Sequence, residues 1–322
     1  MAELRWNPLT KDWVMIASHR QNRPQMPKDW CPFCPGSGKV PDKFTVLKYD
    51  NDFPALSQTP PSPDDVATDL YKVKPSYGKC EVILYSPEHT TTLPELPTGH
   101  IRELVDLWEE RFLEISKDEN IKYVFIFENR GAAVGVTMPH PHGQIYGYSV
   151  IPKKIELEID SFKEHKEETG NCLMCDMLKD EAADGRRIIF ENDDFVVFLP
   201  FFSEYPYGIY IAAKRHIQNL TDMTDKEKDS LAQTLKEAAG TLDSLFDYAF
   251  PYMMCMYQNP VNSGNTDFHH FHIAFYPPMR SADKIKFNAS SETGAWAHCN
   301  PTAPEEKAEE LREAHKKFIS KL

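Results

Sequence analysis

The chain has 322 residues, which can bury one large core or two medium ones, and we expect two domains. Its formal net charge of −13 argues against general nucleic-acid binding, which needs a basic footprint, but a few local donors could still hold a small anionic substrate. Residues 1–6 have neither a basic segment nor an apolar run, and no stretch approaches the length of a membrane span, so we expect a cytoplasmic protein with no membrane partner.

The first half of the chain opens on a short strand or turn over residues 5–16 and a basic, irregular arm that contains Arg20 and Arg23. A C-x-x-C turn follows, with Cys31 and Cys34. Apolar runs and one apolar helical face predict the remaining elements. In chain order these are a strand over 44–49 that leads into Asn51-Asp52-Phe53, a strand over 80–85 before His89, a helix over 98–116, a strand over 123–127, a loop over 128–137 and a strand that begins near His140.

The second half repeats this order after a second C-x-x-C at Cys172 and Cys175. The chain then ends in a Glu/Lys-rich helix of the last ~20 residues, for which Thr302 is the expected N-cap. The repeated elements are a strand over 187–190, a strand that ends near His216, a helix over 225–246, a strand over 253–258 and a strand over 269–275.

Matching elements in the same order predict an α+β fold made from one duplicated unit, an antiparallel sheet with a packed helix, twice. The N-terminal unit is expected over residues 1–155 and the C-terminal unit over residues 156–322. The alternative is two unrelated segments of similar composition.

Each half also combines two thiols on one turn with two imidazoles far along the chain. An odd count of seven cysteines without an export signal argues against a disulfide framework, so reduced cysteines and unrelated histidines are the alternative to a metal site. A Cys2His2 set fits tetrahedral zinc in a closed, structural site, and we predict two zinc ions per chain. The predicted ligands are Cys31, Cys34, His89 and His140 in the first half, and Cys172, Cys175, His216 and His270 in the second, with His269 as the alternative to His270.

The stretch that begins at His140 carries the chemistry. His140 and His142 would point to the same face of a strand, and the prolines on either side of His140 place them at an edge or at a strand's beginning. If His140 binds metal, His142 is the neighbouring nucleophile, and a phosphoryl or nucleotidyl electrophile suits it best. Gly143 lets a bulky group approach, and Gln144 offers an amide donor to developing negative charge. The alternative is that both histidines bind one metal or that one simply packs.

His140-Pro141-His142-Gly143-Gln144, together with the upstream cysteine pair and Ser86-Pro87-Glu88-His89, resembles the galactose-1-phosphate uridylyltransferase branch of the histidine-triad superfamily. The resemblance covers residues 5–315. It implies two tandem histidine-triad-like units that form one extended half-barrel-like sheet. It also implies exchange of UMP between UDP-glucose and galactose 1-phosphate by a ping-pong mechanism, with the uridylyl group carried on His142.

The same resemblance implies roles for further residues. Gln144 would contact the transferred phosphoryl group, and a homodimer would follow if the basic arm and the tail segment reach the neighbouring subunit. The implied substrate-binding residues are Arg20 and Arg23 in the arm, Asn51, Asp52 and Phe53 at the uridine, Asn129, Gly135 and Thr137 at the phosphates, and Lys286 and Glu292 in the tail.

Two other functions remain open from the sequence. One is an ADP-glucose phosphorylase-like adenylyltransferase, and the other is a zinc-stabilised nucleotide-binding protein without turnover. In the second half, His272 occupies the position of His142, but Ala274 stands where Gln144 would be, so we expect that half to have lost catalysis.

Overall fold

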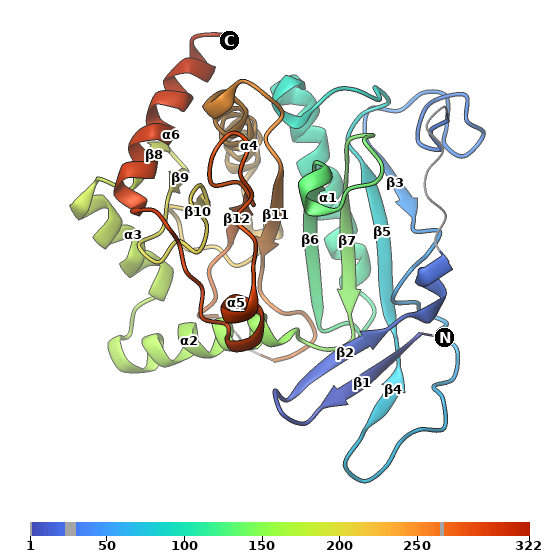
Figure 1. Cartoon of the computed structure of the whole chain (residues 1–322). Helices are drawn as coiled ribbons and strands as arrows, with labels where there is room; N and C mark the ends of the chain where they lie inside the picture. The colour runs from blue at the N-terminus through green and yellow to red at the C-terminus, as the bar shows by residue number, and fades with distance from the viewer. Residues whose placement is uncertain (1, 23–29, 265–266) are drawn as a thin grey trace.

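The computed structural model describes residues 2–22, 30–264 and 267–322, which form two antiparallel sheets (Figure 1). The first half of the chain supplies one side of the large sheet and the second half supplies the other. Across the large sheet the strands are β3 (Leu47–Asp50), β5 (Gly78–Leu84), β7 (His142–Tyr148), β6 (Tyr123–Arg130), β11 (Tyr252–Tyr257), β12 (His272–Tyr276), β10 (Tyr210–Ala213), β9 (Phe195–Phe198) and β8 (Ile188–Glu191). The small sheet contains β2 (Asp12–Ile16), β1 (Glu3–Asn7) and β4 (Val73–Pro75).

Helices lie between the strands in both halves of the chain. The α-helices are α1 (Thr98–Ser116), α2 (Lys153–Thr169), α3 (Leu173–Asp184), α4 (Asp225–Phe246), α5 (Ser290–Ala295) and α6 (Pro304–Ile319). The short 3-10 helices are η1 (Ser18–Asn22), η2 (Leu93–Glu95), η3 (Ala132–Val134) and η4 (Leu220–Asp222). None of the helices in the described part of the chain is long and apolar enough to cross a membrane.

The central pairing joins the two halves. β6 and β11 pair antiparallel from Tyr252↔Arg130 to Met256↔Ile126, so backbone hydrogen bonds run across the junction. On either side of it the order is mirrored, with β6-β7-β5 facing β11-β12-β10. The predicted duplication of an antiparallel sheet with a packed helix is therefore confirmed, and the sheet stays open with β3 and β8 at its edges. The domain boundary at residue 155 stays a prediction.

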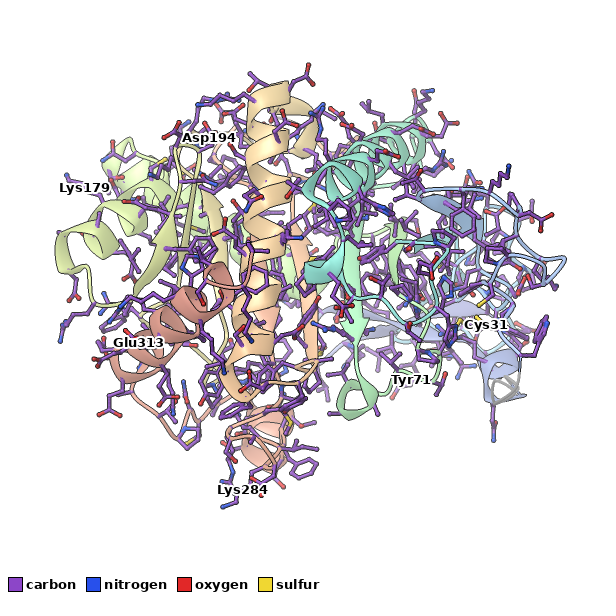
Figure 2. All side chains as sticks on the ribbon, turned by 90° about the horizontal axis from the view of Figure 1, so that it is seen from above. Cys31, Tyr71, Lys179, Asp194, Lys284 and Glu313 are labelled. Carbon is purple, nitrogen blue, oxygen red and sulfur yellow. The ribbon has the colours of Figure 1, made fainter. Side chains whose placement is uncertain are left out.

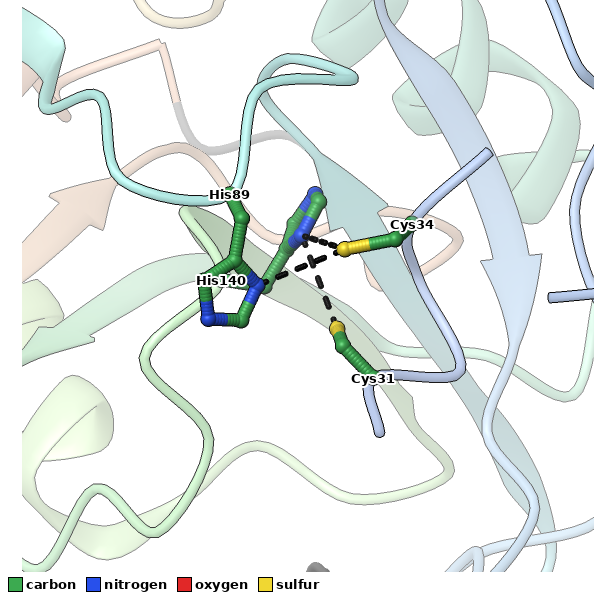
Figure 3. Close-up of side chains that lie close together, drawn as sticks. All are labelled: Cys31, Cys34, His89 and His140. Atoms are coloured by element: carbon green, nitrogen blue, oxygen red, sulfur yellow. Dashed lines mark hydrogen bonds between the residues drawn. The ribbon is translucent and has the colours of Figure 1, made fainter. Parts of the chain in front are cut away.

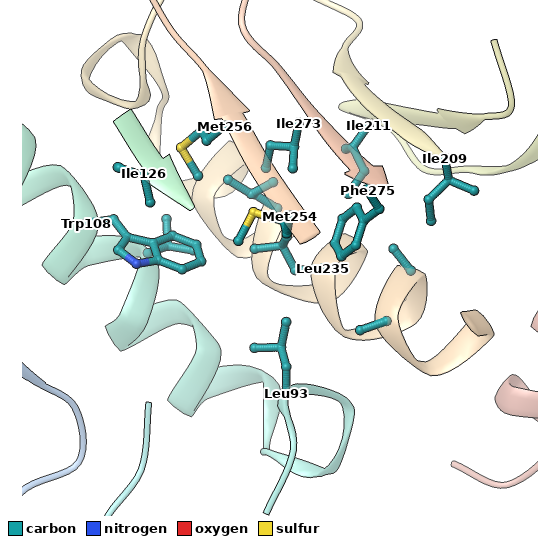
Figure 4. Packing of buried hydrophobic residues seen from close by; sticks show 14 of the residues in the cluster. Leu93, Trp108, Ile126, Ile209, Ile211, Leu235, Met254, Met256, Ile273 and Phe275 are labelled. Carbon is teal, nitrogen blue, oxygen red and sulfur yellow. The ribbon is translucent and has the colours of Figure 1, made fainter. Parts of the chain in front are cut away.

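The back face of the large sheet carries the main core, beneath α1, α4 and α6. Side chains alternate along each strand, so Ile145 of β7 and Ile273 of β12 point to this face. Trp108 of α1 is completely buried there, among apolar side chains from both halves (Figure 4). We use "front face" for the opposite side of the sheet.

The front face differs between the two halves. Over the second half, α2 and α3 cover it, with Ile155 and Phe162 of α2 and Met174 of α3 buried. Over the first half, polar side chains and a cavity lie on the front face of β7. The two halves lie side by side when the molecule is seen from above, with Cys31 on one side and Lys179 of α3 on the other (Figure 2).

The sequence placed the two long helices well and missed others. The predicted bounds of α1 and α4 are confirmed, and Thr224 and Glu227 form a capping box at the start of α4. β3 begins at Leu47 rather than at residue 44, and α2 and α3 were not predicted. The prediction of Thr302 as an N-cap was wrong, because α6 begins after Ala303 with no side-chain cap.

Truncating Trp108 should test the shared back-face core. Trp108→Ala should lower the free energy of unfolding by about 3–5 kcal/mol, because it leaves a cavity between α1 and the sheet. Leu113→Ala is the matched control, since Leu113 lies on the same helix and is 50% exposed. It should change stability by about 0.5 kcal/mol or less. Urea denaturation measures both, and equal losses in the two variants would contradict this account of the core.

Candidate active site

A cavity of about 280 Å³ opens on the front face of β7. His142 and Gln144 both line it, since they are two residues apart on one strand. Most of the residues predicted to bind substrate line the same cavity, although they come from separate segments of the chain. These are Arg20, Asn51, Asp52, Phe53, Asn129, Gly135 and Thr137.

Two predicted residues do not line this cavity, and a third is not described. Lys286 and Glu292 form an ion pair at 3.4 Å, and neither is among the residues that line the cavity. Asn288, between them in sequence, donates to the Tyr205 hydroxyl at 2.9 Å. Arg23 lies outside the described residues.

The ring of His142 is oriented by its own backbone. Its Nδ1 lies 2.7 Å from the carbonyl oxygen of His140, which can only accept a hydrogen bond. The proton therefore sits on Nδ1 and the lone pair on Nε2. This is the tautomer that a nucleophilic histidine needs.

Strand β7 begins at His142 itself. Pro141 precedes His142, and its carbonyl accepts from the backbone N–H of Tyr85 at 3.0 Å. The expectation that the histidines stand at a strand's beginning is confirmed, although β7 lies inside the sheet between β5 and β6. Phe33 packs edge-on against the rings of His140 and His142, with centroid distances of 6.0 Å to each.

The loop after β6 borders the same cavity. It turns sharply at Gly131 (φ 92°) and Gly135 (φ 81°), both in the left-handed region that favours glycine. Between them, η3 closes with a hydrogen bond from the Gly135 N–H to the Ala132 carbonyl at 3.0 Å. Gly131 also packs on Pro251, where any added Cβ would collide. Asn129, near the end of β6, and Gly135 and Thr137 of the loop thus line the cavity.

The turn after β3 supplies a further part of the cavity wall. Asn51 accepts from the Phe53 N–H at 2.9 Å, so this side chain shapes its own turn. Tyr49 donates to the carboxylate of Asp52 at 3.1 Å. Asn51 therefore stabilises the turn with its side chain and also lines the cavity. Tyr49 also lines the cavity and was not predicted, and only its position two residues before Asn51 in the sequence could have indicated it.

The first thiol–imidazole cluster lies beside this cavity (Figure 3). The sulfur of Cys34 is 3.4 Å from Nδ1 of His89 and 3.8 Å from Nδ1 of His140. Cys31 is 3.7 Å from the same nitrogen of His140. Nε2 of His140 donates to the Ser86 carbonyl at 2.8 Å, which turns the Nδ1 lone pair toward the two sulfurs.

The second cluster repeats this geometry in the other half. Nδ1 of His270 is 3.4 Å from the sulfur of Cys172 and 3.6 Å from that of Cys175. Nε2 of His270 donates to the Ala213 carbonyl at 2.9 Å, and His216 completes the group. His269 points elsewhere, with its Nε2 3.4 Å from Glu158, so the four grouped residues include His270 rather than His269.

The protonation of these groups suits a metal site. Burial lowers the pKa of His140 to about 4 and that of His270 to about 3, so both rings are neutral at pH 7. Burial and the adjacent thiol raise the pKa of Cys34 to about 11, so this thiol holds its proton in the absence of a cation. A divalent ion would reverse that preference and displace the protons. Both clusters can therefore hold a metal ion.

The counterpart of the cavity is filled in the second half. His272 is 3% exposed and lies between the rings of Tyr257, at a centroid distance of 4.7 Å, and Tyr210, at 5.7 Å. Both rings are nearly parallel to the imidazole, at 8° and 16°. Glu158 from α2 lies 3.6 Å from its Nε2. Packed aromatic side chains thus occupy the volume that a ligand would need.

Gly143 offers a test of the close packing behind the nucleophile. A Cβ at this position would collide with the hydroxyl of Tyr85 and would lie 3.1 Å from the carbonyl oxygen of Phe127. Gly143→Ala should lower the free energy of unfolding by about 1–3 kcal/mol. Tyr85→Phe should restore part of that loss in the double variant, because it removes the colliding oxygen. Thermal denaturation of the four proteins measures the cycle, and strict additivity would contradict the proposed collision.

The chain resembles known proteins over nearly its whole length. The N-terminal domain of galactose-1-phosphate uridyl transferase matches residues 1–152, and the C-terminal domain of the same family matches residues 158–318. The galactose-1-phosphate uridylyltransferase of Thermotoga maritima is 41% identical over 315 residues, which cover 97% of this chain and 98% of that protein.

Solved structures agree with these matches. A uridylyltransferase structure superposes with a TM-score of 0.91 at 32% identity, and the match covers 98% of this chain and 99% of the other. An ADP-glucose phosphorylase from Arabidopsis thaliana, solved with bound ADP-glucose, has a TM-score of 0.75 at 24% identity over 97% of this chain and 99% of its own, and therefore shares the fold. Since both domain matches and the full-length relative agree with the cavity around His142, the chain belongs to the galactose-1-phosphate uridyl transferase family.

Proposed function

We propose that this protein exchanges a uridylyl group between UDP-glucose and galactose 1-phosphate by a ping-pong mechanism, with His142 as the covalent carrier. The observation that carries the proposal is the orientation of His142 in the cavity. Its Nδ1 is bonded to the His140 carbonyl, which leaves the lone pair on Nε2. Family membership supplies the substrate class.

In the first half-reaction, Nε2 of His142 attacks the α-phosphorus of UDP-glucose. The bond from that phosphorus to the bridging oxygen breaks, and glucose 1-phosphate leaves with the bonding electron pair. The ring keeps its Nδ1 proton and becomes cationic, and the His140 carbonyl at 2.7 Å stabilises that charge. Gln144, from the same face of β7, donates its amide to the oxygens of the transferring phosphoryl group.

In the second half-reaction, a phosphate oxygen of galactose 1-phosphate attacks the same phosphorus. The phosphorus–nitrogen bond breaks, UDP-galactose leaves and neutral His142 is restored. Asn129, Gly135 and Thr137 line the wall where the phosphates would lie. The uridine would lie at the other end, against Asn51, Asp52 and Phe53, and Arg20 would supply positive charge.

We further propose that both thiol–imidazole clusters hold zinc in structural roles. Zinc bonds of about 2.3 Å to sulfur and about 2.05 Å to nitrogen place tetrahedral ligands about 3.6 Å apart. The sulfur–nitrogen distances here are 3.4–3.8 Å. With four protein ligands each site is closed, so zinc would fix the position of His140 and leave the chemistry to His142.

A homodimer is part of the same proposal. Lys286 and Glu292 do not line the cavity of their own chain, although the family resemblance assigns them to phosphate and sugar. Their contribution would come from a second subunit. A cytoplasmic location remains a prediction as well.

The nucleophile is tested by labelling. Enzyme incubated with UDP-glucose labelled in the α-phosphate should take up an acid-labile, base-stable label, because a phosphorus–nitrogen bond has those stabilities. His142→Ala should take up none, while His298→Ala, a histidine outside the cavity, should label normally. Label from ADP-glucose alone would favour an adenylyl donor. Normal exchange activity in His142→Ala would refute the mechanism.

The metal assignment is tested by elemental analysis. We expect two zinc ions per chain, with one lost in Cys31→Ser and one lost in Cys172→Ser. Cys299→Ser is the control, since Cys299 is exposed and outside both clusters. Fewer than one zinc ion in the unmodified protein would refute both sites.

Zinc should be released by acid. Burial lowers the pKa of His140 from the ordinary 6.5 to about 4. As pH falls from 6.5 toward 4, the unfolded chain takes up a proton at this residue that the folded chain does not, so the folded state that forms the site loses stability. The thiolates that bind zinc also compete with protons. A zinc-sensitive dye should therefore detect release that increases as pH falls below about 6. Tight retention of zinc at pH 4 would contradict the Cys2His2 assignment.

A further inference from the structure

The orientation of the Gln144 amide is not settled by the strand alone. A glutamine side chain has a donating end, Nε2, and an accepting end, Oε1, and rotation about its last bond exchanges them. Only the donating end can stabilise the oxygens of a phosphoryl group. The accepting end would place lone pairs against negative charge. The proposed mechanism therefore needs a neighbour that holds Oε1 away from the substrate.

Tyr146 is the neighbour in contact with that oxygen. Its hydroxyl donates to Oε1 of Gln144 at 3.3 Å, from two residues further along the same face of β7. The ring of Tyr146 is 7% exposed and packs edge-on against Phe127 at a centroid distance of 5.1 Å. Its position is therefore set by packing, independently of the hydroxyl.

A tyrosine hydroxyl can donate to Oε1 or accept from Nε2, so a further group must select between the two. Arg20 lines the same cavity and favours the first arrangement, because its positive charge attracts the hydroxyl oxygen and repels the hydroxyl proton. Burial raises the pKa of Tyr146, the nearby Cys80 thiol adds to that rise, and the charge of Arg20 opposes it. The hydroxyl therefore keeps its proton at neutral pH and can donate it to Oε1 of Gln144, the contact that the structure shows at 3.3 Å.

We propose that Tyr146 is a positioning residue for uridylyl transfer, which turns the Gln144 amide so that its NH2 group meets the transferring phosphoryl oxygens. The inference rests on the proposed role of Gln144. The hydroxyl of Tyr146 donates to the accepting end of the amide, and Arg20, Gln144 and Tyr146 all line the same cavity.

Tyr146→Phe tests the contact with Gln144, because it removes the hydroxyl oxygen and keeps the ring packed on Phe127. Single-turnover labelling from UDP-glucose should slow about fivefold, the size expected for one neutral hydrogen bond. The KM for UDP-glucose and the melting temperature should stay the same, because the ring and the cavity wall are unchanged. Tyr148→Phe is the matched control, since Tyr148 lies next on the same face of β7 and does not line the cavity.

A double-variant cycle separates positioning from other effects. In a Gln144→Ala background, Tyr146→Phe should change the labelling rate by less than about twofold, because no amide remains to be oriented. A full fivefold loss in that background, or an unchanged rate in Tyr146→Phe alone, would overturn the inference. Failure of the unmodified enzyme to take up label would instead refute the proposed function.

Discussion

The structure of the site depends on how His140 is held. One ring nitrogen donates to the Ser86 carbonyl at 2.8 Å, and the other faces the thiols of Cys31 and Cys34. These contacts join three segments far apart in sequence to the residue that comes two before the nucleophile. The His140 carbonyl in turn orients His142 at 2.7 Å. A cluster of residues that could hold a metal ion thus positions the carbonyl that sets the tautomer of a histidine outside the cluster.

The duplication shows which parts of this arrangement belong to the scaffold. His270 makes the same two kinds of contact in the second half, with thiols at 3.4 and 3.6 Å and the Ala213 carbonyl at 2.9 Å. His272 then bonds the His270 carbonyl at 3.0 Å, as His142 bonds that of His140. The halves diverge on the front face, where aromatic rings and α2 cover His272 but a cavity surrounds His142.

The back of β7 is as constrained as its front. A Cβ at Gly143 would point to the back of β7 and meet the hydroxyl of Tyr85, so glycine is required by this contact rather than by access for substrate, which the sequence had suggested. Glu128, on the neighbouring strand, accepts from Tyr252 at 3.2 Å. Burial raises the pKa of Glu128 to about 7, opposed by Arg130 and Tyr252. Polar groups therefore lie in the core behind the nucleophile, although apolar side chains there would avoid the cost of burying polar atoms.

The sequence by itself determined the duplicated α+β order, the bounds of α1 and α4, both sets of grouped cysteines and histidines, and the pairing of His142 with Gln144 on one face. Periodicity and local motifs carry this information, because they depend on neighbours within one helix or strand. The sequence did not predict α2 and α3, whose largely polar patterns gain a buried face only against the sheet. Tertiary structure alone decided between His269 and His270, buried Tyr146 against Phe127 and beside Arg20, and filled the second half with tyrosine rings. These features depend on which side chains meet across strands and between distant segments. The order of residues along the chain does not say which side chains will meet in this way.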